Sequence, residues 1–387
     1  MKLDTIILNN FFEMLNSTDA EYCVMNNYDN LPDIIPSDVD IAVDLHTFQK
    51  LDSLIKRLAD DHNVSITQKI WHGYNKCAFI LSPIEIQSYF YLQLDFFVDF
   101  CGSGFPNLFP NNLMQHAKKR YKNFYVPAVE VEVPFLLQRR IFKGDINDRH
   151  VQILVKLFHK NREAVSRSIK GIFGDGVGNS LITFIETESV ETFNDNYFIY
   201  QKKLKEISSF NTSILYRVKY MLWQFIRAMY RLYYPTGISI AFVGENTQLK
   251  KELIEKFDAI VSGSFYGLAS FAPSNLLEYI KYIMIEGYWS KVTKKKVFLN
   301  MNTLDSDWKQ AFSNRLLTYI LPMPDVVVCL EKNIGKLSGN TTNNIVGYKL
   351  NKKDDFDKIL LDLTCIVLSK QVQQTKKHLM NRISPTG

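Results

Sequence analysis

Two carboxylates lie two positions apart, at Asp38 and Asp40, in the segment 36–43 (PSDVDIAV). The segment has the composition of a buried strand, and side chains alternate between the faces of a strand, so both acids point to one face. Like charges side by side repel unless a cation lies between them, and carboxylate oxygens bind divalent cations. The spacing therefore indicates a metal site. The alternative is a strand end whose solvent face carries two acids.

The elements expected around these acids alternate between strand and helix over residues 1–130. Helical spacing of apolar residues predicts two helices, over residues 4–15 and 45–58. Runs of β-branched and aromatic residues predict strands over residues 21–25, 64–71, 77–81 and 87–98. This alternation is typical of an α/β module.

The order of these elements resembles the nucleotidyltransferase fold of the DNA polymerase β type. In that family a Gly-Ser pair ends the first strand and grips the triphosphate. Here Asn26 and Asn27 stand at that place, with ten residues between Asn27 and Asp38, and amide side chains donate hydrogen bonds to phosphate. The resemblance implies a nucleotide-binding set of Asn26, Asn27, Ser37 and Lys76. For Lys76, on a predicted hairpin, the simpler alternative is an exposed lysine.

The resemblance also implies a third carboxylate, on a strand beside the Asp-x-Asp strand, that completes a two-metal site and accepts the proton of the attacking hydroxyl. Asp95 lies inside the apolar run 87–98, where an unpaired charge is costly, whereas Asp99 follows its end. Asp95 is therefore the preferred third residue. The predicted catalytic and metal-binding set is Asp38, Asp40 and Asp95, with Mg²⁺ or Mn²⁺ as the cofactor.

Composition excludes several classes of protein. The 387 residues are 46% hydrophobic and 22% charged, as expected for a globular chain of two or three domains. The five cysteines are scattered and form no CxxC pair, which fits neither a disulfide framework nor a zinc site. No signal peptide and no long uncharged apolar run is recognised. We expect a cytoplasmic protein without a membrane span.

The net charge of +6 is unevenly distributed along the chain. Residues 1–130 hold 10 basic against 16 acidic residues, a balance of −6, and residues 131–387 hold 36 against 24, a balance of +12. An acidic part that binds metal, followed by a basic part suited to phosphate or anionic lipid, is the simplest interpretation. The alternative is an asymmetry that serves solubility alone.

Residues 131–235 are predicted to be helical. Their apolar cluster at residues 154–158 is surrounded by basic residues that we interpret mostly as solvated helix faces: Arg139, Arg140, Lys143, Arg149, Lys156, Lys160, Arg162 and Arg167. Farther on, within residues 214–234, one polar stripe leaves a broad face of Leu, Met, Trp, Phe and Tyr; the stripe consists of Arg217, Gln224, Arg227 and Arg231. Such a helix suits a membrane interface. A domain-bridging helix buried against its neighbours has the same pattern.

The segment 238–243 (ISIAFV) has the composition of a buried parallel strand, and a helix is expected to follow it as far as Phe257. The strand, the loop with Gly244 and Lys250, and the helix resemble the P-loop opening of thymidylate kinases. A working P-loop has a second glycine before the lysine and a hydroxyl residue after it. Leu249 and Lys251 stand at those positions, which predicts a degenerate loop.

Two further strands of the same part also depart from the kinase pattern. The strand expected over residues 296–301 lacks the Asp-Arg that ends it in thymidylate kinases, and no arginine-rich lid follows the Pro-Asp strand expected over residues 324–331. We therefore interpret this part as an inactive kinase-like domain that serves as a scaffold or as an anion- or partner-binding surface.

The predicted fold class is α/β with three parts. Residues 1–130 form a nucleotidyltransferase-like mixed sheet with helices, residues 131–235 a helical region with a basic aromatic linker helix, and residues 236–387 a parallel-sheet, P-loop kinase-like domain. This combination resembles bacterial proteins associated with capsule and O-antigen assembly.

The resemblance implies a Mg²⁺-dependent nucleotidyl- or phosphoryl-transferase that acts on a sugar, polyol-phosphate or glycan acceptor. Peripheral contact with the inner face of the membrane would bring it to a lipid-linked acceptor, and nucleic acid is not the expected partner. One alternative is a non-catalytic nucleotide-binding or assembly protein. Another is a toxin-like nucleotidyltransferase that modifies tRNA or protein through the basic helical region. The sequence leaves the nucleotide, the acceptor and the oligomeric state open.

Overall fold

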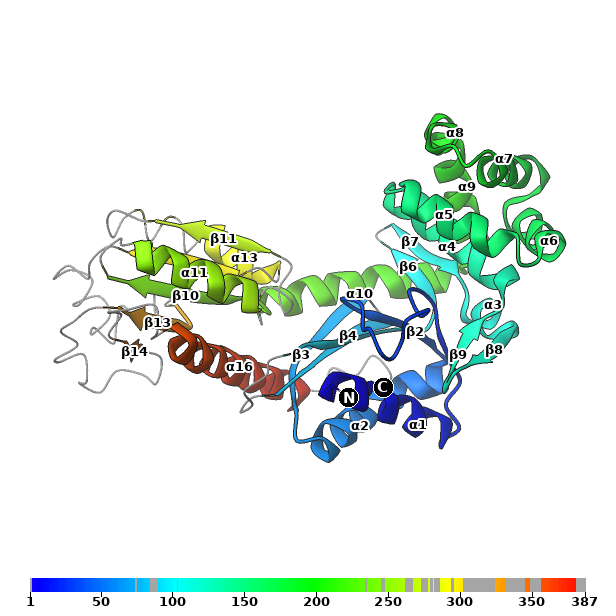
Figure 1. Cartoon of the computed structure of the whole chain (residues 1–387). Coiled ribbons are helices and arrows are strands. Elements are labelled where there is room, and N and C mark those ends of the chain that lie inside the picture. Colours follow the sequence, from blue (N-terminus) through cyan, green and yellow to red (C-terminus); the bar gives the residue numbers. More distant parts are fainter. Residues whose placement is uncertain are drawn as a thin grey trace.

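The structure, a computed structural model, has a mixed sheet in its N-terminal part, a group of helices in the middle and a parallel sheet in its C-terminal part (Figure 1). It describes residues 2–73, 75–83, 90–102, 104–233, 235–244, 248–261, 267–272, 278, 281, 286–293, 296–301, 324–330, 345–348 and 356–380. The α/β class, with one mixed and one parallel sheet, is confirmed. The identities of the parts as nucleotidyltransferase-like and kinase-like stay predictions.

The N-terminal sheet has the strand order β1-β2-β5-β4-β3. Its strands are β1 (Tyr22–Val24), β2 (Val39–Val43), β3 (Ser65–Gly73), β4 (Lys76–Ser82) and β5 (Leu92–Phe97). Strands β2 and β5 are parallel, and the other neighbours are antiparallel. The predicted strands agree with these bounds, except that the strand expected from residue 87 begins at Leu92 and residues 84–89 lie outside the described part.

The two faces of this sheet pack against different partners, because side chains alternate along each strand. Val39, Ile41 and Val43 share a core with helices α1 (Leu3–Asn16) and α2 (Leu45–Asp61), which confirms the two predicted helices. Asp40 and Ala42 point to the opposite face. The acids of β2 therefore lie on the face that the first two helices do not cover.

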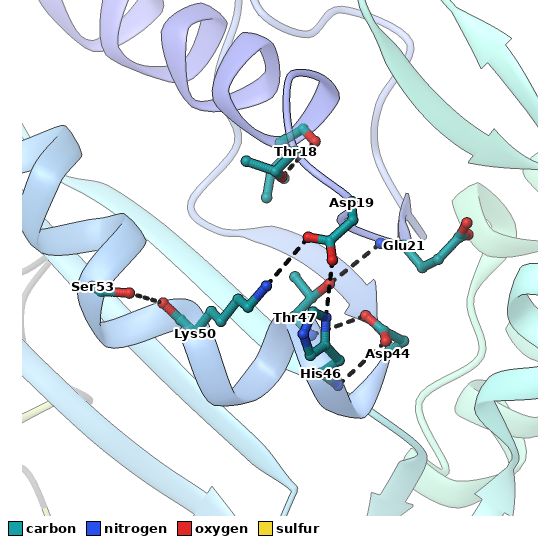
Figure 2. Close-up of polar contacts among 9 residues, drawn as sticks. Thr18, Asp19, Glu21, Asp44, His46, Thr47, Lys50 and Ser53 are labelled. Atoms are coloured by element: carbon teal, nitrogen blue, oxygen red, sulfur yellow. Dashed lines mark hydrogen bonds and ion pairs between the residues drawn. The ribbon is translucent and has the colours of Figure 1, made fainter.

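A network of polar contacts fixes the start of α2 directly after β2 (Figure 2). The Asp44 carboxylate caps the helix, with Oδ1 accepting from the Thr47 amide at 3.0 Å and Oδ2 from the His46 amide at 3.3 Å. Asp19, in the loop after α1, lies 3.3 Å from the Lys50 ammonium. An N-cap is typically worth about 1 kcal/mol. Together these contacts fix the connection between β2, the strand that carries Asp40, and α2.

The middle of the chain covers the other face of the sheet. It begins with short elements: β6 (Phe100–Gly102), β7 (Phe105–Phe109), α3 (Asn111–His116), β8 (Lys118–Tyr121) and β9 (Phe124–Pro127). Helices follow, as predicted: α4 (Val129–Lys143), α5 (Asp148–Phe158), α6 (Arg162–Phe173), α7 (Asp175–Thr187), α8 (Val190–Asp195) and α9 (Tyr197–Phe210). Ala42 and Phe97 of the sheet belong to the same apolar core as Phe135 and Leu137 of α4. Helix α4 therefore lies against the face that carries the acids.

The C-terminal sheet has the order β11-β12-β10-β13-β14, with every pairing parallel. Its strands are β10 (Ile238–Val243), β11 (Leu268–Phe271), β12 (Lys296–Met301), β13 (Val326–Cys329) and β14 (Ile345–Gly347), with helices α11 (Gln248–Val261) and α13 (Tyr288–Val292) beside them. The predicted strands over 238–243 and 296–301 are confirmed. The strand expected over residues 324–331 covers Val326–Cys329, and Glu331 lies outside the described residues.

Two long helices, α10 (Ile214–Tyr233) and α16 (Phe356–Met380), lie between the two sheets (Figure 1). Helix α16 contributes Phe356 and Leu363 to the C-terminal core, and farther along the Thr375 hydroxyl donates to the Thr67 carbonyl oxygen of β3 at 2.8 Å. Helix α10 contacts β3 through its polar stripe. Its apolar face is exposed, so the expectation that this face is buried against neighbours is wrong. None of the described helices has the length and apolarity needed to cross a membrane.

Candidate metal and nucleotide site

Asp38, Asp40 and Asp95 converge at one point of the N-terminal sheet. Each offers a carboxylate oxygen, and these oxygens all lie within 4.8 Å of one another. In the parallel register Asp40 is the direct neighbour of Asp95, which explains why acids 55 positions apart meet. Carboxylate oxygens grouped in this way can hold a divalent cation. The structure thus brings together the three residues that the sequence predicts as metal ligands.

Burial makes the three acids unequal. Asp40 and Asp95 are 5% and 6% exposed, whereas Asp38 is half-buried and its carboxylate accepts a hydrogen bond from the Ser37 hydroxyl at 2.9 Å. Asp95 accepts from Gln93 Nε2 at 2.9 Å. Two carboxylates out of water, side by side, require positive charge close to them.

Arg139 of α4 supplies part of that charge. Its Nη1 lies 2.6 Å from Asp40 Oδ2, and both side chains are almost fully buried. Most of the basic residues predicted on solvated faces are exposed, namely Lys143, Arg149, Lys156, Lys160, Arg162 and Arg167. Arg139 and Arg140 are the exceptions among them: Arg140 is 7% exposed and pairs with Asp145 at 3.0 Å. Arg139 is the cation that α4 places against the acids of the sheet.

The surrounding charges move the pKa values of the two buried acids in opposite directions. Burial alone would raise the pKa of Asp40, but the charges of Arg139 and Lys76 and the hydrogen bond from Arg139 outweigh it, so the pKa lies below its usual value. For Asp95 burial dominates, Lys76 only partly offsets it, and the charge of Asp40 adds to it, so the pKa rises to about 6. Without a bound cation, the Asp95 carboxyl therefore holds a proton more tightly than the Asp40 carboxyl does.

A cavity of about 290 Å³ opens above the acids. Three cations line it together with the three carboxylates, Lys76 from β4 and Arg139 and Lys143 from α4. Aromatic rings complete the lining: Phe97, Phe100, Phe135 and Phe142. A Cβ at Gly102 would overlap the ring of Phe142, so glycine is needed there for this ring to pack. Acids, cations and rings around one cavity match the parts of a metal-bound nucleotide.

The predicted nucleotide-binding residues are only partly brought together. Lys76 lines the cavity, but Asn26, Asn27 and Ser37 are not among its lining residues. The turn of Asn26 and Asn27 does begin beside the acid strand, because the Met25 amide donates to the Asp40 carbonyl oxygen at 2.9 Å. Asn27 adopts a φ of 52°, a left-handed conformation that asparagine tolerates in turns. Roles for these three residues stay predictions.

Asp99, the alternative third acid, has a different environment. Its carboxylate accepts hydrogen bonds from the Asn111 amide at 2.9 Å, from Asn75 Nδ2 at 3.2 Å and from the Tyr216 hydroxyl at 3.3 Å. These partners tie together the start of α3, the turn before β4 and helix α10. The preference for Asp95 over Asp99 agrees with this geometry.

Among the described residues after β10, the two ends of the loop are joined by a hydrogen bond. Lys250 is 1% exposed, and its ammonium donates to the Gly244 carbonyl oxygen at 2.8 Å. Gly244 has a φ of 142°, and a Cβ there would lie 3.3 Å from the Leu330 Cβ. Both residues that match the P-loop pattern therefore have structural roles at this strand end. Residues 245–247 lie outside the described part.

Sequence reasoning missed the contribution of α4 to the cavity. Phe135, Arg139, Phe142 and Lys143 lie at offsets of 4, 7 and 8 along the chain, which is the spacing of one helix face. Two aromatic and two basic residues on one face of a largely apolar helix were the sequence pattern that could have predicted this contribution. In comparisons with known proteins, no family model, curated protein or solved structure matches the chain. The resemblances to nucleotidyltransferases and thymidylate kinases therefore stay predictions, and support for a function comes from the geometry of the cavity.

Proposed function

We propose that the protein is a metal-dependent nucleotidyl- or phosphoryl-transferase with its active site in the cavity above Asp38, Asp40 and Asp95. The observation that carries the proposal is the convergence of the three carboxylates in a cavity that three cations also line. The formal charges of these six side chains cancel. A divalent cation among the acids would leave the cavity net positive, and a polyphosphate would restore the balance.

Asp38, Asp40 and Asp95 would hold Mg²⁺ or Mn²⁺, which supplies charge neutralisation at the transferred phosphoryl group. Lys76 and Lys143 would bind the phosphate oxygens opposite the acids. Asp95, which is buried beside Asp40, would also accept the proton of the acceptor hydroxyl. The rings of Phe100 and Phe142, at the cavity wall, would exclude water and pack against the base or the acceptor.

The acceptor follows from the resemblance rather than from the cavity. A sugar, polyol phosphate or glycan of a bacterial surface polysaccharide carries the hydroxyl that such a transfer needs. The C-terminal sheet, with its closed loop, would serve as a scaffold and not as a second kinase site.

A second candidate is a non-catalytic nucleotide-binding protein, and the Asp40–Arg139 pair favours it. The guanidinium occupies the carboxylate oxygen Oδ2 that would otherwise be open to a cation. In that case the nucleotide would bind through Lys76, Arg139 and Lys143 without metal.

Isothermal titration of the full chain with each common nucleoside triphosphate, with and without Mg²⁺, tests both candidates. Asp95→Asn is the informative variant, because Asp40→Asn would leave the charge of Arg139 buried without its partner. Asp99→Asn is the matched control, a second buried aspartate four residues along that lies outside the cavity.

The transferase proposal expects Mg²⁺-dependent nucleotide binding that weakens by more than about 100-fold in Asp95→Asn and is retained in Asp99→Asn. Binding that is equally tight without Mg²⁺ and in Asp95→Asn would support the non-catalytic candidate instead. No nucleotide binding under any condition would exclude both. If nucleotide binding is found, mass spectrometry of small molecules that co-purify with the chain would identify the class of acceptor.

A further inference from the structure

Helix α10 is amphipathic in the reverse sense to an ordinary surface helix. Its polar stripe faces the protein: Arg227 Nη1 donates to the His72 carbonyl oxygen at 2.8 Å, and Arg231 Nη2 donates to that of Trp71 at 3.1 Å. Of its twenty residues, only Tyr220 is buried. The polar residues of a surface helix normally face water.

The opposite face of α10 is a continuous apolar surface. Eight large side chains on it are between 51% and 81% exposed: Ile214, Leu215, Val218, Met221, Leu222, Phe225, Met229 and Tyr233. Their offsets of 4, 7, 8, 11, 15 and 19 from Ile214 place most of them along one side of the helix. Contiguous exposed apolar surface of this kind marks a site of interaction.

We propose that this face of α10 docks on a lipid bilayer that carries anionic headgroups, with the helix lying in the plane of the interface. Interfacial helices combine an apolar face with a basic polar face and low overall hydrophobicity. Helix α10 holds four basic residues and no acidic one, and residues 200–235 hold seven basic against one acidic. The charge of this region is complementary to anionic lipid.

The basic residues keep their charge although they face the protein. Arg217 donates to the Thr212 hydroxyl and to the Ser209 carbonyl oxygen, and Arg227 donates to a carbonyl oxygen, so these partners are neutral. Arg217 and Arg227 are half-buried, and salt screens partly buried charges less than exposed ones. Their guanidinium groups would therefore contribute a positive potential at the apolar face.

A second copy of the chain fits this face less well. Helix α10 holds four basic residues and no acidic one, so pairing two such helices would bring two strongly basic regions together. Anionic headgroups would instead neutralise this charge, and the charge therefore favours a membrane surface.

Flotation of the full chain with lipid vesicles tests the proposal. The vesicles consist of phosphatidylcholine alone or of phosphatidylcholine mixed with phosphatidylglycerol. Leu222→Ser, Phe225→Ser and the double variant remove apolar side chains that contribute little to folding, because both are exposed. Phe198→Ser, which changes an exposed phenylalanine of α9, is the matched control. Circular dichroism on heating confirms that each variant folds.

We expect the native chain and Phe198→Ser to float with the anionic vesicles, and added salt to weaken the binding. The double variant should partition at least about tenfold more weakly. Equal flotation of the double variant would overturn the proposal, as would equal binding to neutral vesicles. A native chain that binds no vesicle would also overturn the proposal. If this chain forms a dimer that Phe225→Ser dissociates, the apolar face of α10 is an interface with a second copy. None of these outcomes depends on nucleotide binding, so the test is independent of the transferase proposal.

Discussion

The two sheets of this protein differ in how charged side chains are arranged beside strand β2 and after strand β10. Beside β2, two buried carboxylates and a third acid line a cavity together with Lys76, Arg139 and Lys143. After β10, one buried ammonium, that of Lys250, is turned back onto the Gly244 carbonyl oxygen. The first arrangement leaves room between opposite charges, and the second closes the charge within its own loop.

This difference distinguishes the proposed site at the mixed sheet from the turn after β10. The buried carboxylates of Asp40 and Asp95 are retained at a cost in stability, because both are desolvated and, among the described residues, the close ion pair is that of Asp40 with Arg139. Such a cost is expected where ligand binding compensates it. A lysine whose hydrogen bond stabilises its own strand–loop–helix turn needs no ligand to explain it. This contrast supports the proposal that the active site lies at the mixed sheet.

The largest expected effect comes from breaking the ion pair of the mixed sheet. Arg139→Met keeps the bulk of the side chain but leaves Asp40 buried without its cation, so we expect the free energy of unfolding to fall by about 3 kcal/mol. Mg²⁺ should restore part of this loss, because a metal can take the place of the guanidinium. Urea denaturation with and without Mg²⁺ measures both changes.

Arg167→Met is the matched control for this prediction. Arg167 forms an exposed ion pair with Glu163, 3.6 Å apart, and such pairs contribute less than about 1 kcal/mol. If Arg139→Met were no more destabilising than Arg167→Met, the buried pair would not be the feature that holds α4 against the acids. If Mg²⁺ had no effect on Arg139→Met, the three carboxylates would not be a metal site.

A smaller effect comes from comparing the two lysines directly. Lys76→Met should weaken the binding of Mg²⁺-nucleotide by about 10-fold or more, the value of one charge-assisted hydrogen bond. Lys250→Met should leave nucleotide affinity unchanged, because its ammonium is occupied by Gly244. Isothermal titration of both variants decides the matter. A loss of binding in Lys250→Met alone would reverse the comparison and make the parallel sheet the nucleotide site.

The sequence predicts the acids of the site and Lys76, but not the places of Arg139 and Lys143. Side chains alternate along a strand with a period of two, so Asp38 and Asp40 share a face. Asp95 lies inside a second apolar strand, where an isolated charge is costly, so a position beside the other acids and a shared cation is favoured. Arg139 meets Asp40 across 99 positions of sequence. Its place depends on which face of α4 packs on the sheet, and periodicity alone does not choose between an inward and an outward stripe.

Helix α10 shows the same limit. The spacing of its basic residues correctly predicts one polar stripe, but the usual rule would place that stripe in water. Carbonyl oxygens at the end of β3 accept from Arg227 and Arg231 instead, so the polar side turns inward. The rotation of a helix about its axis depends on partners elsewhere in the chain. The existence of an element is therefore easier to predict than the direction in which it faces.

The smallest expected effect concerns Glu132, a buried acid that is not among the lining residues of the cavity. Glu132 of α4 is 4% exposed, its Oε2 accepts from the Tyr28 hydroxyl at 2.7 Å, and burial raises its pKa to about 7. Because the folded pKa lies above the unfolded value, the folded state binds more protons, and stability falls as the pH rises toward the folded pKa and levels off above it. Between about pH 6 and about pH 8 this group should cost about 1 kcal/mol of unfolding free energy.

Glu132→Gln keeps an acceptor for Tyr28 and removes the titration, so its stability should fall less over this pH range than that of the native chain. Urea denaturation at both ends of the range measures the difference. Equal pH dependence of the two proteins would mean that burial on this face of the sheet does not raise a carboxyl pKa. The raised pKa of Asp95 would then have to come from the charge of Asp40 rather than from burial, and its role as a base would depend on Arg139 keeping that charge in place.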